Sequence, residues 1–202
     1  MKLPTKLLTT VILSPLLIAC ATSSPETKVY SLSAPDSQPQ PAVSTQGISI
    51  GVGPIQFPDK LKRPQIVTRL SDNRMSLSEQ HHWAGNLEAE FLTILVQNII
   101  SQTGTPRTYS YPWDNRRRPH YQIELTIYQF DGELGGTSNL SANWALISND
   151  GHKIIHQHST RLSEPNIDHT YETLVEGQSK LITRLSTEIS QRLRQHLKAP
   201  QN

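Results

Sequence analysis

The sequence predicts an α+β fold, in which a mainly antiparallel sheet is covered on one face by two amphipathic helices. Three segments in the second half of the chain alternate apolar and polar residues, which is the two-residue period of a half-buried strand. Two longer segments repeat apolar residues every three to four positions, which is the period of one helix face. The resulting order, β-β-β-α-β-β-β-α, predicts a sandwich of two layers, because both helices need a sheet to cover.

A single domain is predicted over residues 47–198, behind a tether that covers residues 20–46. The tether is rich in Ser, Thr, Pro and Gln and has too few apolar residues to fold alone. Within it, residues 28–32 alternate like a strand and are expected to join the edge of the sheet. Residues 33–46 are expected to form a mobile loop, and the tether would set the distance between the domain and its membrane.

The first strand of the domain is predicted over residues 48–52, whose apolar side chains alternate. The Gly-Pro pair at 53–54 is expected to end it. Residues 65–70 are rich in β-branched side chains, and a Ser-Asp-Asn turn separates them from a shorter strand over residues 74–77. These two segments predict a β-hairpin.

The first helix is expected to begin after Ser78, a favourable N-cap residue followed by Glu79 and Gln80, which suit a first turn. Gly104 falls where a C-cap is expected. The apolar stripe between them consists of Trp83, Leu87, Phe91, Ile94 and Leu95.

An antiparallel meander follows, because residues 121–127, 140–146 and 153–162 all alternate and Asn-Asp-Gly at 149–151 is a hairpin turn signal. The chain closes with a long amphipathic helix. Its apolar face consists of Tyr171, Leu174, Val175, Leu181, Ile182, Leu185, Ile189 and Leu193.

The N-terminus predicts a lipoprotein signal peptide over residues 1–19. Lys2 and Lys6 precede an apolar run over residues 7–18, and Leu-Ile-Ala stands before Cys20. The run holds about 12 residues, whereas a membrane-spanning helix needs roughly 20, so the alternatives are a cleaved signal and a buried strand or short helix. Cys20, the only cysteine, is the predicted lipidation site, for example by palmitate, and Ala21 after it favours the outer membrane.

Charge and motifs exclude the common enzyme and nucleic-acid classes. Two of the 19 basic residues and none of the 17 acidic ones precede Cys20, so the mature chain balances 17 against 17. The sequence has no nucleophile elbow, phosphate loop or dinucleotide fingerprint, and no cofactor is expected apart from the lipid on Cys20. His156 and His158, beside His152, are interpreted as a solvated strand face rather than metal ligands, and His81 with His82 as polar helix surface.

An arginine triplet at 116–118 follows Trp113 in a loop of the predicted domain. A basic run beside an aromatic side chain can contact phosphate headgroups or an acidic partner, and it can equally be a solvated loop. Both interpretations stay open at this point.

Six motifs resemble the ABC-type transport auxiliary lipoprotein family, the PqiC/YmbA group of membrane integrity-associated transporter subunits. The most specific is Arg63-Pro64-Gln65-Ile66-Val67-Thr68-Arg69. The others, in order, are Tyr30-Ser31-Leu32, Gly51-Val52-Gly53-Pro54-Ile55, Trp83-Ala84, Tyr111-Pro112-Trp113 and Phe130-Asp131-Gly132.

The resemblance implies a non-catalytic, outer-membrane-anchored auxiliary or docking subunit of an MCE-type lipid transport system in the periplasm. The implied partners are an MCE-domain tunnel protein, inner-membrane transport components and further copies of the chain, in a ring. We expect the partner surface to include Arg63, Gln65, Arg69 and Trp113. The alternative function is an interaction lipoprotein of envelope assembly, such as a pilotin or a cell-wall synthase activator, which needs the same anchor and a similar domain.

Overall fold

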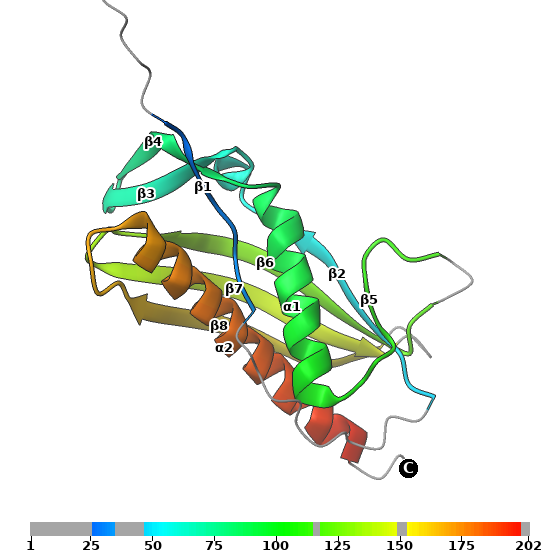
Figure 1. Cartoon of the computed structure of the whole chain (residues 1–202). Coiled ribbons are helices and arrows are strands. Elements are labelled where there is room, and N and C mark those ends of the chain that lie inside the picture. The colour runs from blue at the N-terminus through cyan, green and yellow to red at the C-terminus, as the bar shows by residue number, and fades with distance from the viewer. Residues whose placement is uncertain (1–25, 35–46, 115–117, 149–152, 199–202) are drawn as a thin grey trace, which may run out of the picture.

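The structure is a computed structural model, and it describes residues 26–34, 47–114, 118–148 and 153–198. Two helices pack on one face of a five-stranded sheet, and a separate three-stranded sheet lies at one end of the molecule (Figure 1). The predicted α+β class is confirmed. The single sheet expected from the sequence is divided into two mixed, mostly antiparallel sheets.

The five-stranded sheet has the order β5-β2-β6-β7-β8. The predicted meander forms its antiparallel part, and the turn expected at 149–151 lies outside the described residues. In contrast, β2 is parallel to both β5 and β6. The strands are β2 (Ile50–Gln56), β5 (Thr108–Ser110), β6 (Tyr121–Gly132), β7 (Thr137–Ser148) and β8 (Lys153–Pro165).

The prediction that Gly53 and Pro54 end the first strand is wrong, because β2 continues through both residues to Gln56. A register shift between Val52 and Ile55 absorbs the interruption. Proline cannot donate a ladder hydrogen bond, and a bulge is one of the few places where a strand tolerates it.

The three-stranded sheet has the order β1-β4-β3 and contains the predicted hairpin. Its strands are β1 (Lys28–Tyr30), β3 (Gln65–Ser71) and β4 (Arg74–Trp83), and a short 3-10 helix, η1 (Asp59–Leu61), precedes β3. β1 lies at the edge of this sheet and pairs with β4 in parallel. The segment at 28–32 therefore enters a different sheet from the meander.

The predicted start of the first helix is wrong: β4 runs through Ser78 to Trp83, and α1 (Leu87–Thr103) begins eight residues later than expected. The Ser78 hydroxyl does accept the backbone N–H of His81 at 3.1 Å, a cap-like bond made within an irregular strand. The true N-cap is Asn86, whose Oδ1 accepts the Ala89 N–H at 2.9 Å. Gly104, with φ +67°, is the C-cap as predicted.

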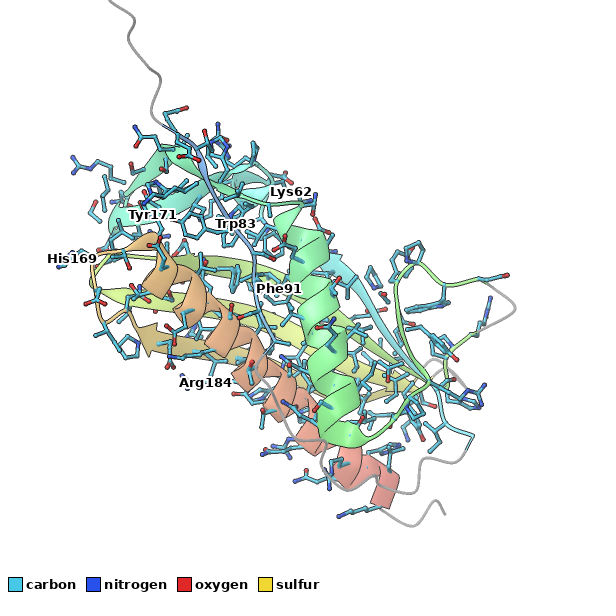
Figure 2. All side chains as sticks on the ribbon, viewed as in Figure 1. Lys62, Trp83, Phe91, His169, Tyr171 and Arg184 are labelled. Carbon is cyan, nitrogen blue, oxygen red and sulfur yellow. The ribbon has the colours of Figure 1, made fainter. Side chains whose placement is uncertain are left out.

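The core lies between the helices and the five-stranded sheet. α2 (Tyr171–Lys198) buries the predicted apolar face, apart from the half-buried Tyr171. Phe57, Phe91 and Phe130 meet edge-to-face, with ring centroids 5.1 to 6.1 Å apart. Figure 2 shows Phe91 on α1 facing this core.

Candidate partner-binding site

Two of the six sequence motifs meet in a buried ion pair. The Arg69 guanidinium on β3 donates to both carboxylate oxygens of Asp131 on β6, from Nε at 3.2 Å and Nη2 at 2.7 Å. The Asp131 side chain is fully buried, while that of Arg69 is 17% exposed. The hydrogen bond to Asp131 raises the pKa of Arg69. This pair joins the three-stranded sheet to the end of the five-stranded sheet.

Asp131 has two further partners inside the chain. Gln129 donates to its Oδ1 at 2.8 Å, and the Lys60 ammonium lies 4.0 Å from its Oδ2. A buried carboxylate needs several such partners, because its desolvation is costly. Arg69, predicted from the sequence to bind a partner, is thus already bound within the domain.

Two other motifs meet at the opposite end of β6, where β2 lies against the loop between β5 and β6. A Cβ atom at Gly51 would lie 2.7 Å from Cζ3 of Trp113 and 2.6 Å from Cγ of Pro119. A Cβ atom at Gly53, whose φ is +115°, would lie 2.6 Å from Cβ of Tyr111. The two glycines therefore let both aromatic residues pack directly on the backbone of the strand.

Tyr111, Trp113 and Arg118 form what we call the aromatic loop. The rings of Tyr111 and Trp113 meet edge-to-face with centroids 5.3 Å apart, and Tyr111 is 48% exposed. Arg118 is exposed, and the rest of the arginine triplet lies outside the described residues. A hollow of about 600 Å³ adjoins the loop, lined by Thr108, Tyr109, Ser110, Pro112, Trp113 and Asp114.

The structure does not bring the predicted site residues together. Arg63 is exposed and Gln65 half-buried, and both belong to the three-stranded sheet or the turn before it. Trp113 packs against Gly51, which pairs with Gln122 at the other end of β6. Gln122, paired with Gly51, and Asp131, paired with Arg69, are nine residues apart on β6, or about 30 Å of extended strand.

The histidines have partners that sequence periodicity did not indicate. His156 and His158 lie against Trp144, with ring centroids 5.2 and 6.0 Å away, and desolvation is the main cause that lowers the pKa of His156. His81 lies on β4 rather than on the predicted helix, and its ring stacks on that of Tyr171 with centroids 3.9 Å apart. Within the described part of the chain, no three His, Cys, Asp or Glu residues lie close enough to hold a metal ion.

Residues 28–34, which we call the N-terminal strap, fall within the predicted tether. Residues 28–30 form the edge strand β1, as expected from their alternation, and the residues after them pack against the helices. Leu32 is 6% exposed and joins the core. The Leu32 N–H donates to Glu90 of α1 at 3.1 Å, and the Ser33 N–H donates to Ser179 of α2 at 3.2 Å. The alternation at 28–32 indicated the strand. The contacts with the two helices could not be predicted, because they do not follow from any sequence periodicity.

Tyr30, near the start of the strap, is hydrogen-bonded to α2. Its hydroxyl donates to Glu172 Oε1 at 3.0 Å, and burial together with this bond raises the pKa of Tyr30 to about 12. Figure 2 shows Tyr171 and Trp83 at this junction between the three-stranded sheet and the helices. Of the helices that the structure describes, neither is long and apolar enough to cross a bilayer. Cys20 lies outside the described residues.

Comparison with solved structures finds the same fold in proteins of low sequence identity. An uncharacterized protein is 20% identical, with a TM-score of 0.68 over 84% of this chain and 99% of its own. A protein from Xanthomonas campestris is 12% identical, with a TM-score of 0.70 over 84% of this chain and 97% of its own. No curated protein matches the chain by sequence.

The solved structures show the fold alone, because their sequence identity is low. The family is shown by a match to a family model. Residues 30–190 match the ABC-type transport auxiliary lipoprotein component, and this range includes all six motifs and both ends of β6. The resemblance noted from the sequence is confirmed. The chain belongs to the family of ABC-type transport auxiliary lipoprotein components.

Proposed function

We propose that this protein is a non-catalytic docking subunit of an MCE-type lipid transport system, held at the periplasmic face of the outer membrane by lipid on Cys20. Family membership supports a role in transport. The signal peptide that ends in Leu-Ile-Ala before Cys20 supports the lipid anchor, and Ala21 supports its location in the outer membrane. The aromatic loop is the proposed contact with the MCE-domain protein or with the inner-membrane components.

The observation that carries the proposed contact is the placement of the aromatic loop. Tyr111 and Trp113 are rigid aromatic side chains held on a strand, beside exposed Arg118 and a hollow. Aromatic and arginine side chains are the residues most enriched among those that dominate interface energies. The loop also lies about 30 Å along β6 from the sheet that contains β1, the first strand after the anchor.

Lipidation is tested by fractionating cells that express Cys20→Ala. The account predicts a folded protein that leaves the membrane fraction, while Ser31→Ala, an exposed substitution shortly after the anchor, stays with it. A Cys20→Ala protein that remained in the membrane fraction would contradict the anchor.

The docking role is tested by co-purification from crosslinked membranes. We expect the MCE-domain protein to accompany the wild-type chain and to be lost with Tyr111→Ser plus Arg118→Glu. The matched control is Tyr128→Ser plus Arg161→Glu, two exposed residues of the five-stranded sheet that repeat the same chemistry. Recovery of pilus or cell-wall synthesis proteins in place of MCE proteins would favour an envelope-assembly role instead.

A further inference from the structure

The three-stranded sheet exposes one large apolar side chain from each of its strands. Val29 on β1 is 66% exposed, Leu70 on β3 is 53% exposed and Leu77 on β4 is 45% exposed. Seven large hydrophobic residues are exposed in the described part of the chain, and three of them fall in this sheet of 20 residues. The three side chains are spread along β4, because Val29 pairs with His82 whereas Arg69, next to Leu70, pairs with Met75. A contact that uses all three must therefore be broad rather than a single pocket.

The connection to Cys20 limits where this sheet can be. Eight residue steps separate Cys20 from Lys28, and a fully extended chain of that length reaches at most about 29 Å. The strap adds no slack, because β1 is paired with β4 and Leu32 is buried. For comparison, α2 has 28 residues and is about 42 Å long. The distance from Cys20 to β1 is therefore always shorter than the long helix of the domain.

We propose that the three-stranded sheet rests on the phospholipid surface in which Cys20 is anchored, with Val29, Leu70 and Leu77 in contact with the lipid headgroup region. This inference relies on the lipidation proposed above. It adds a second, direct membrane contact to the lipid anchor.

The charged side chains of the three-stranded sheet do not explain the proposed membrane contact. Lys28, Arg63 and Arg74 are exposed in this region, but exposed Glu26, Asp72 and Glu79 balance them. Arg69 is neutralised by Asp131. The contact is therefore apolar, and we expect it to be as strong on zwitterionic as on anionic vesicles. A contact based on the basic residues would weaken with added salt.

The test uses full-length lipidated protein in phosphatidylethanolamine–phosphatidylglycerol vesicles that carry a spin-labelled quencher lipid. Cys20 is the only natural cysteine, and its lipid blocks the thiol, so a fluorophore attaches only to an introduced cysteine. Leu70→Cys and Leu77→Cys place the label on the proposed surface. Tyr128→Cys and Ile154→Cys are matched controls on the five-stranded sheet, 55% and 57% exposed.

The proposal predicts blue-shifted emission and lipid quenching at positions 70 and 77, and neither at positions 128 and 154. Equal quenching at all four positions, or none at 70 and 77 in vesicle-bound protein, would overturn the membrane contact and leave the anchor intact. A blue shift without lipid quenching would assign the surface to another protein copy. Protein that fails to sediment with vesicles would instead overturn the lipidation itself.

Discussion

At the residue scale, the structure explains the motifs as pairs of residues that meet across the fold. Arg69 and Asp131 lie 62 positions apart in the sequence and form one buried ion pair. Gly51 and Trp113 are likewise distant and in direct packing contact. From the sequence, Arg69 and Trp113 were both assigned to the partner surface, because residue patterns along one chain do not show which residues meet in the fold.

We expect Asp131→Ala to lower the free energy of unfolding by about 3 kcal/mol, because it leaves the largely buried Arg69 guanidinium without its carboxylate. Urea denaturation measures the change. Arg74→Ala, on the same hairpin but exposed, is the control and should stay within about 0.5 kcal/mol of wild type. Equal effects of the two substitutions would show that the ion pair does not hold the sheets together.

Gly51→Ala should displace the Trp113 ring, because its Cβ atom would lie 2.7 Å from that ring. Overpacking of this kind costs about 1–3 kcal/mol of stability. Tryptophan fluorescence and near-UV circular dichroism report the displacement. Gly85→Ala is the matched control, since its Cβ atom would approach only the flexible end of Glu90, at 3.3 Å. Unchanged spectra for Gly51→Ala would contradict the proposed packing.

At the element scale, the strap and β4 show how tertiary contacts override local sequence signals. Alternation correctly indicated a strand near Val29, but burial of Leu32 in the core was not visible in a segment rich in Ser and Pro. In the same way, a Ser78 hydroxyl suited to an N-cap makes its bond inside β4. Period and capping signals identify elements well and element boundaries poorly.

Leu32→Ala should destabilise the domain by about 2–3 kcal/mol, because it removes a buried side chain from the core. Val29→Ala, three residues earlier and 66% exposed, should change stability by less than about 0.5 kcal/mol. Thermal and urea denaturation give both values. A neutral Leu32→Ala would mean that the strap is an accessory to the fold and part of the tether after all.

Acidification should destabilise the packing of β8 against α2 through His156. The pKa of His156 is lowered by desolvation beside Trp144, and also by Arg192 and His158. The unfolded chain therefore binds more protons, so this contribution is complete above the ordinary pKa of 6.5 and is lost as the pH falls through and below it. His156→Gln should flatten the dependence of unfolding free energy on pH between 7.5 and 5. An unchanged slope would exclude His156 as its source.

At the scale of the whole molecule, the two ends of β6 have different roles in the proposed function. One end bears the three-stranded sheet, whose strand β1 begins eight residues after Cys20 in the sequence, and the other end supports the aromatic loop. Figure 1 shows this sheet at one end of the molecule. We could predict the fold class, the meander, the hairpin and the closing helix from the sequence, because each depends on the spacing of apolar residues within single segments. The division into two sheets was not, because it depends on long-range pairing of β2 with β5 and β6.

In the proposed function, the aromatic loop faces a transport partner while the opposite end of β6 is held at the membrane. The most direct measurement is photocrosslinking in cells, with a photoreactive phenylalanine analogue at position 111 or, as the control, at position 128. Both tyrosines are about half exposed, at 48% and 55%. We expect an adduct with the MCE-domain protein from position 111 alone. The same adduct from position 128, or no adduct from position 111, would contradict the proposed function.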